Sequence, residues 1–410
     1  MLIPLLLAWT PSPVPQEAPD LPDLYAIKAS VLETGTGEVI EHAVLLVEGG
    51  KVITVGEDLV VERGIPVYEL DPDQVVIPGL VNAYTRVGMT GSGQSGARPW
   101  QRASDELYPA AGDYSGVRET GVTTLGHYPS GNGIPGRCVV VRPKGSTASA
   151  MTIKDDAYLK VIMGSSKSAK DALSGGFKKA DTWIAKEKKN KEKWDKAKEK
   201  FDKEKDKEKK AKLDPGPYKP LADDPSAASF MQLRDGSLKA LISVRTAGDY
   251  LHLIDAIGEE EFTWDLRVVM TRDMNIYHVI EKVAKSGRRV VLEPEISLHP
   301  GTMRQRNLPA EFARAGTPVV LVPRSDSVAG FKAWRRHVGE IVASGLDRST
   351  AMRAITLEPA ALLGVDDQVG SLEAGKQANF VILSGDPFEP GTQVDAVILD
   401  GVLVSGEVNL

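Results

Sequence analysis

The sequence predicts an α/β protein in which a parallel β/α unit lies between two shorter β segments, one near each end of the chain. Short runs of alternating apolar and polar residues, separated by glycine-containing turns, fill residues 24–77 and recur at residues 379–404. Between them, apolar strands alternate with helical stretches, the pattern of a parallel β/α arrangement. A length of 410 residues suits a barrel-sized domain with a smaller companion.

The two β segments are expected to meet in one small domain. Residues 24–77 and residues 365–410 both carry the two-residue periodicity of half-buried strands. A single β-sandwich built from both chain ends is the simplest arrangement. The remaining residues, 78–364, then form the β/α unit.

This β/α unit is expected to be a TIM-like (β/α) barrel, either regular or distorted. Seven apolar strands can be counted, whereas a closed barrel of this kind has eight. Either a further strand is hidden in residues 151–161 or the barrel is incomplete. The seven candidate strands are residues 75–77, 122–125, 139–141, 238–244, 266–270, 289–292 and 318–322.

One stretch within this unit differs sharply in composition. The chain has a formal charge of −6, yet residues 186–212 hold 14 Lys against 8 Asp or Glu, which leaves −12 for the rest. An acidic body argues against general nucleic-acid binding. Residues 181–214 are rich in helix formers and predict one long solvated helix that ends at Asp214, either as a plain insertion or as an arm for a protein or an anionic surface.

The N-terminal residues favour export without settling it. An apolar run at residues 2–9 precedes a proline-rich stretch, which resembles a trimmed signal peptide, but no Lys or Arg occurs before Lys28. A disordered tail over residues 1–23 is the alternative reading. Periplasmic or extracellular location is favoured over cytoplasmic, and the run is too short for a transmembrane span of about 20 residues. The single cysteine, Cys138, excludes an intramolecular disulfide.

Two segments carry a resemblance to a known family. Residues 76–88 read VIPGLVNAYTRVG, and residues 351–401 contain AIT, EPA, GSLEAGK and ANFVIL before Asp400 and Gly401. The second segment predicts a helix that stops at Gly364 and a turn that leads into a strand. Together they resemble the amidohydrolase superfamily, which includes dihydroorotases, adenine deaminases and imidazolonepropionases. The resemblance implies a barrel with a β-sandwich and a catalytic zinc or other divalent metal.

The metal-binding motif of that family is absent here. Family members end the first barrel strand in His-x-His, and these positions read Tyr84 and Arg86. A guanidinium cannot lose its proton at working pH and repels a cation, so Arg86 opposes a metal. No metal ligand and no cofactor are therefore predicted. Asp326 stands where the family keeps its proton-accepting aspartate, although an aspartate there is also a common helix cap.

Other polar residues follow predicted strands at the same edge. His127 lies in a glycine-rich loop that matches no nucleotide-binding pattern. Arg245 and Arg324 follow later strands. With Tyr84 and Arg86, these residues form the predicted binding set, although a histidine that only hydrogen-bonds its own loop is the commoner case.

Three functional hypotheses remain. The first is a family member without its metal ligands that binds a ligand without hydrolysing it. The second is an active hydrolase of non-peptide C–N bonds, in which Asp326 is the base, His127 and His299 hold one metal and Arg86 binds a substrate carboxylate. The third is a barrel that serves as a platform for the helix of residues 181–214. Fold resemblance alone does not choose among them.

Overall fold

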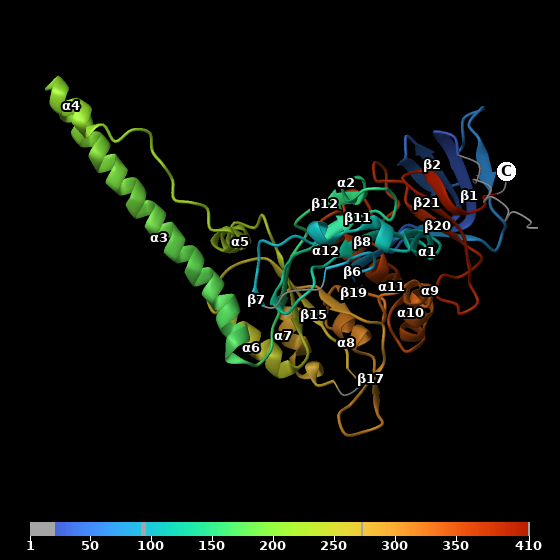
Figure 1. Ribbon diagram of the computed structural model, residues 1–410. Coiled ribbons are helices and arrows are strands. Elements are labelled where there is room, and N and C mark those ends of the chain that lie inside the picture. The colour runs from blue at the N-terminus through green and yellow to red at the C-terminus, as the bar shows by residue number, and fades with distance from the viewer. Residues whose placement is uncertain (1–20, 92–95, 272–273, 409–410) are drawn as a thin grey trace, which may run out of the picture.

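The computed structural model describes residues 21–91, 96–271 and 274–408. Figure 1 shows a β-rich part that contains both blue and red strands, a larger α/β body beside it, and a long helical arm that projects from the body. The expected tail of residues 1–23 lies almost entirely outside the described residues. No helix among the described residues is both long enough and apolar enough to span a membrane.

The β-rich part is one eight-stranded sheet made from both ends of the chain. Its strand order is β22-β21-β20-β5-β1-β2-β3, with β4 paired to β1. The antiparallel pairing of β5 with β20 joins the two chain ends, since Ile77 lies opposite Val381. The strands are β1 (Leu24–Glu33), β2 (Val39–Glu48), β3 (Lys51–Glu57), β4 (Val67–Glu69), β5 (Val75–Pro78), β20 (Phe380–Leu383), β21 (Val394–Leu399) and β22 (Val402–Gly406).

Residues 75–77 were expected both within the β segment of residues 24–77 and among the strands of the β/α unit, and only the first expectation is correct. These residues are β5 and pair with β1 and β20, so the first strand of the body is β6 (Leu80–Thr85). Only Gly79 separates β5 from β6. A Cβ atom at Gly79 would lie 2.2 Å from Thr123 Oγ1, and the glycine therefore lets the chain cross between sheets at close quarters.

The body contains two further main sheets. One has the order β12-β11-β8-β6 and the other the order β10-β13-β14-β15-β16-β19. β6 and β8 are parallel, and the same holds for each neighbouring pair in the series β13, β14, β15, β16 and β19. The strands are β8 (Val122–His127), β10 (Gly136–Arg137), β11 (Val139–Val141), β12 (Thr152–Lys154), β13 (Leu159–Ile162), β14 (Ala240–Val244), β15 (Trp264–Val268), β16 (Val290–Leu292) and β19 (Val319–Leu321); short pairs are β7 (Gly96–Ala97) with β9 (Gly133–Ile134) and β17 (Ser297–Leu298) with β18 (Gln305–Arg306).

One expectation for these strands needs correction, because residues 139–141 form β11, which pairs antiparallel with β8 and is not a parallel strand. A further parallel strand was expected within residues 151–161 as one of two alternatives, and β13 begins in that range and ends one residue beyond it. Lys160 inside β13 interrupts its apolar pattern, and for that reason the strand was hard to find.

The strands of both sheets contribute to one shared apolar cluster. Residues 136–141 join the two sheets, since β10 pairs with β13 and β11 pairs with β8. β6 and β19 form no backbone ladder with each other among the described residues. The interior side chains come from both sheets and from α12 (Leu357–Leu363); they include Val81, Cys138, Leu241, Val291, Val320 and Leu363.

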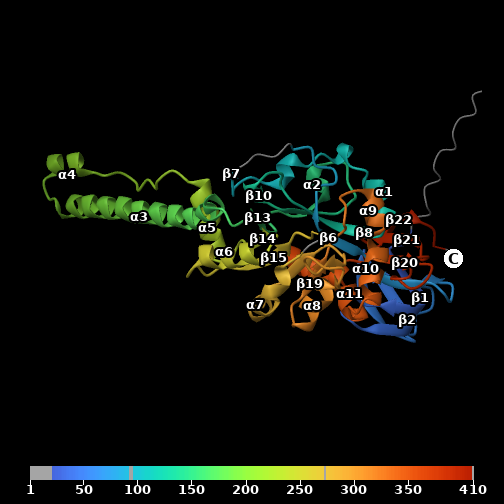
Figure 2. The ribbon, with the colours of Figure 1, turned by 90° about the horizontal axis from the view of Figure 1, so that it is seen from below.

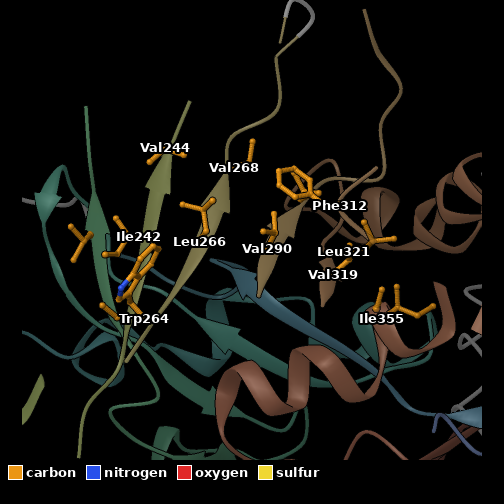
Figure 3. Packing of buried hydrophobic residues seen from close by; sticks show 14 of the residues in the cluster. Ile242, Val244, Trp264, Leu266, Val268, Val290, Phe312, Val319, Leu321 and Ile355 are labelled. Atoms are coloured by element: carbon orange, nitrogen blue, oxygen red, sulfur yellow. The ribbon is translucent and has the colours of Figure 1, made fainter. Parts of the chain in front are cut away.

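The alternate residues of the same strands face outward into a second core. Figure 3 shows Ile242, Leu266 and Val290 in a row, with Phe312 near Val290 and Ile355 near Val319 and Leu321. Because both faces are covered, the strands read as continuous apolar runs. This two-sided burial explains why the body's strands were recognisable from sequence.

Helices cover the outer face of the strands. α6, α7 and α8 each connect consecutive parallel strands of the six-stranded sheet. α12 ends at Gly364, which has the left-handed φ of +67° that the sequence predicted for a helix-terminating glycine. The helices are α1 (Tyr114–Arg118), α2 (Ala148–Met151), α5 (Pro225–Arg234), α6 (Ala247–Ile257), α7 (Ile280–Lys285), α8 (Leu308–Arg314), α9 (Val328–Lys332), α10 (Trp334–Ala343) and α11 (Arg348–Ile355), with 3-10 turns η1 (Ala103–Glu106), η2 (Pro109–Ala111) and η3 (Ile276–Val279).

The arm consists of two helices. α3 (Lys167–Lys203) starts at the cap Ser166, and α4 (Lys207–Leu213) follows a short break (Figures 1 and 2). The prediction of a single helix over residues 181–214 was therefore wrong at its start and in its continuity, whereas its end at Asp214 agrees with the C-cap of α4. The break occurs because the Asp206 carboxylate accepts hydrogen bonds from two backbone N–H groups and starts a new helix.

Candidate functional site

The carboxyl ends of the parallel strands bring several charged and aromatic side chains to one edge. β6 ends beside Tyr84 and Arg86, β8 ends at His127, and Asp326 follows β19. Ligands bind at this edge in parallel β/α architectures.

Arg86 is held by protein acceptors. Its Nη1 lies 3.2 Å from Glu106 Oε2 and donates to the Tyr128 carbonyl oxygen at 3.0 Å, while Nη2 donates to the Gly91 carbonyl oxygen at 2.9 Å. The Glu106 side chain is 8% exposed, so this is a largely buried ion pair. Arg86 is thus a fixed positive charge at the end of β6.

Tyr84 lies in a stack of aromatic and cationic groups. Its ring is 3.8 Å from the Tyr128 ring, at an interplanar angle of 21°. The Arg267 guanidinium lies 4.2 Å from the Tyr84 ring centre and pairs with Glu293 at 2.5 Å. Burial raises the pKa of Tyr84, and Arg267 offsets this only in part, so the phenol stays neutral near neutral pH.

Lys160 on β13 is a member of this cluster that sequence reasoning missed. It is 5% exposed, and its Nζ lies 4.0 Å from the Tyr128 ring centre and 3.3 Å from the Pro129 carbonyl oxygen. Burial lowers the pKa of Lys160 to about 7, helped by the charges of Arg267 and Arg86. The sequence feature that could have identified Lys160 is a lysine between two apolar residues of a strand. Arg267, Glu293 and Glu106 were missed as well.

Asp326 connects the two outer strands of the body. Its carboxylate accepts hydrogen bonds from the Thr85 hydroxyl and, at 2.6 Å, from the Arg86 backbone N–H. The surrounding strand ends desolvate the carboxyl and raise the pKa of Asp326, although the residue keeps exposed surface. It does not cap the following helix, because Ser327 caps α9. Asp326 therefore bridges β6 to the segment after β19.

His127 is completely buried, next to Val87. Its Nε2 donates to the Val87 carbonyl oxygen at 2.6 Å, and its Nδ1 has no hydrogen-bond partner among the described residues. Burial lowers the pKa of His127 to about 4. The imidazole is therefore neutral at pH 7, and its short hydrogen bond joins it to the loop after β6, with the Tyr114 hydroxyl 3.5 Å from the same nitrogen. His299 follows β17, and its ring packs 5.2 Å from Tyr277.

The two remaining arginines of the predicted set lie near the surface. Arg245 follows β14 and is exposed, and its backbone N–H donates to Asp249 at 3.2 Å. Arg324 donates from Nε to the Pro294 carbonyl oxygen at 2.7 Å and pairs with Glu340 at 3.1 Å. Arg324 is thus tied to neighbouring segments, whereas the Arg245 guanidinium is the more open of the two.

The metal that the family resemblance implies does not fit this set of residues. The phenol of Tyr84 and the guanidinium of Arg86 stand at the two positions where the family has imidazoles, and the Lys160 amine and the Arg267 guanidinium lie beside the Tyr84 ring. In the part of the chain that the structure describes, no three His, Cys, Asp or Glu side chains are grouped so as to hold an ion. No chemical step is therefore derived through a metal.

Comparison with known proteins supports the family resemblance. Residues 261–408 match the model of the amidohydrolase family. No curated protein matches the chain. An amidohydrolase structure from Thermotoga maritima MSB8 has a TM-score of 0.74 at 20% identity, over 93% of this chain and 100% of that one.

Two more solved structures share the fold at lower similarity. A prolidase complexed with N-methylphosphonate-L-proline has a TM-score of 0.53 at 14% identity, and another amidohydrolase has 0.53 at 13%, each over 94% of this chain and 100% of its own. These likenesses concern the fold. The chain has the fold of amidohydrolase structures along most of its length, and its residues 261–408 match the amidohydrolase family model.

Proposed function

We propose that this protein uses the amidohydrolase fold to bind a ligand or partner and does not carry out metal-dependent hydrolysis. The observation that carries this proposal is the pair of guanidinium groups of Arg86 and Arg267, with the Lys160 amine beside them, around the rings of Tyr84 and Tyr128. Arg86 stands where an active relative has a neutral imidazole, and it cannot release its proton to bind an ion.

The lowered pKa of Lys160 reflects how strongly this environment disfavours a positive charge. Its pKa falls from 10.5 to about 7, which corresponds to about 5 kcal/mol against one added proton. Most of that cost comes from burial and the rest from the two guanidinium groups. The guanidinium charges of Arg267 and Arg86 would oppose a divalent cation at this position as well.

We also propose that the two sheets of the body form one distorted TIM-like barrel. Residues 136–141 join the sheets on one side, and Asp326 connects the end of β6 to the segment after β19 on the other. The interior side chains of both sheets form one cluster. Residues 78–364 would then be the barrel, and residues 24–77 with 365–410 the β-domain.

An active hydrolase of amides or cyclic amides is the alternative. Asp326 favours it, since its raised pKa suits a general base and it lies at the expected strand end. Tyr84, Arg86, His127, Arg245 and Arg324 would then be the substrate-binding set. Of these, Arg245 has the most freedom to reach a ligand, because Arg86 and Arg324 already hold protein acceptors.

Turnover separates the two proposals. Purified protein is incubated with cyclic amides, dihydropyrimidines and acyl-amino acids, with and without added zinc, beside the Asp326→Ala variant. Our proposal expects the same background rate in every case. Hydrolysis by the wild type that the Asp326→Ala variant loses would establish the alternative.

A role for the arm as a docking element is a second proposal. Residues 214–224 return along α3 and are fixed to it: Trp194 Nε1 donates to the Gly216 carbonyl oxygen at 3.0 Å, and Asn190 donates to the Lys219 carbonyl oxygen at the same distance. These contacts make the arm stiffer than a free charged helix. A deletion of residues 184–221 is expected to remove a protein or anionic-surface partner in a pull-down, and retention of that partner would contradict the proposal.

A further inference from the structure

A cavity lies where the β-domain meets the α/β body. It has a volume of about 410 Å³ and is bordered by α9, α10, the end of α1, the loop between β20 and β21, and β22. Figure 2 shows α9, α1 and β22 close together at this junction, and both α9 and β22 contact α1. The cavity is therefore built from segments distant in sequence and separate from the strand-end cluster.

Arg335 on α10 is the buried charge of this cavity. It is 8% exposed, and its guanidinium donates to the carbonyl oxygens of Pro387 at 3.0 Å and Thr392 at 3.1 Å. No carboxylate among the described residues forms an ion pair with it. The contrast is Arg137, which is buried to a similar degree but pairs with Asp156 at 2.8 Å.

The other charged groups of the cavity do not neutralise Arg335. Arg336 pairs with Glu340 at 3.0 Å, and Lys332 has no ion-pair partner in the described segments. Glu119 and Glu389 also line the cavity, but neither lies within ion-pair distance of Arg335. Burial lowers the pKa of Arg335 to about 10, with no opposing contribution from a carboxylate.

The two carbonyl contacts use only some of the hydrogen-bond donors of the Arg335 guanidinium. They attach the loop between β20 and β21 to α10, which is a structural role. A guanidinium has five N–H donors in a planar fork, so several remain for another acceptor. A buried charge normally has a counter-ion, because an isolated one is costly.

We propose that this cavity binds a small oxyanion, a phosphate or carboxylate group, between Arg335 and Lys332. The guanidinium fork matches such a group bidentately, and the Lys332 ammonium adds a point charge. Since the cavity borders both parts of the molecule, the bound anion stabilises their junction. This site is independent of the proposed function at the strand ends.

The test measures thermal unfolding of the full chain in increasing inorganic phosphate or malonate, with sodium chloride at matched ionic strength as reference. A saturable rise in Tm is expected with at least one oxyanion, and the one that saturates at lower concentration identifies the preferred group. No rise beyond chloride with either anion would overturn the proposal.

Variants locate the effect. Lys332→Gln, at an exposed position, should weaken the apparent affinity roughly tenfold, the loss of one charge-assisted hydrogen bond. Lys282→Gln, at an exposed position on α7, is the matched control and should bind as the wild type does. Arg335→Lys keeps the charge without the fork and should weaken binding further. Equal binding by the Lys332→Gln and Lys282→Gln variants would place the anion elsewhere and refute the site.

Discussion

Acid should destabilise the protein through the buried histidine His127. The pKa of its imidazole falls from 6.5 to about 4 in the folded chain. Between these values the unfolded chain binds a proton that the folded chain does not, so stability falls as the pH drops from 6.5 to 4. The difference of 2.5 corresponds to about 3 kcal/mol when the transition is complete.

Urea unfolding at pH 7.0, 6.0 and 5.0 measures this loss. The wild type is compared with His127→Gln, which can still donate a hydrogen bond to the Val87 carbonyl oxygen but does not titrate. Carboxylates contribute equally to both proteins, so the difference between them isolates the histidine. At pH 5.0 the wild type should have lost about 2 kcal/mol more than the variant. Equal pH dependence in the two proteins, or an NMR titration of His127 with a pKa at or above 6.5, would refute the reasoning.

Three other perturbations have defined outcomes in unfolding experiments. Arg86→Ala leaves the Glu106 carboxylate buried without its cation and should cost about 3 kcal/mol, of which Glu106→Gln in the same chain recovers much; additive losses in a double-mutant cycle would contradict a coupled pair. Gly176→Ala places a Cβ atom 2.0 Å from a buried phenylalanine ring and should destabilise the base of the arm by about 1–3 kcal/mol, whereas Gly175→Ala meets no atom within 4 Å and should be neutral or stabilising by up to about 1 kcal/mol, so similar effects would exclude this packing. Replacement of residues 184–221 by a short glycine-serine linker should leave Tm nearly unchanged, because the described contacts of that segment are largely within the arm; a large drop would show that the arm supports the body.

The sequence predicted the outline of the fold because the burial of strand and helix faces requires apolar residues at regular positions. Strands such as β14 and β19 are covered on both faces and read as apolar runs, and Gly364 marked the end of a helix. Residues 75–77 were misplaced because β5 is as apolar as a body strand. Only its pairing partners distinguish it, and these are not encoded locally.

The candidate site was predicted less completely. Tyr84, Arg86 and Asp326 could be selected because they occupy positions of a family motif, and the structure brings Arg86 and Asp326 into contact. Lys160 and Arg267 could not, because their importance arises from long-range packing of charged groups around two tyrosine rings. Single-sequence patterns show strand position but not which buried charges share one environment.

The metal content of the purified protein tests the central claim most directly. The chain is expressed with zinc, manganese and iron in the medium, dialysed against metal-free buffer and examined by elemental analysis. Because positive groups surround the end of β6, we expect far less than one transition-metal ion per chain. One tightly held ion per chain would contradict the account. A change in the fluorescence or NMR signals of the strand-end residues when a chelator removes the ion would place it at this site.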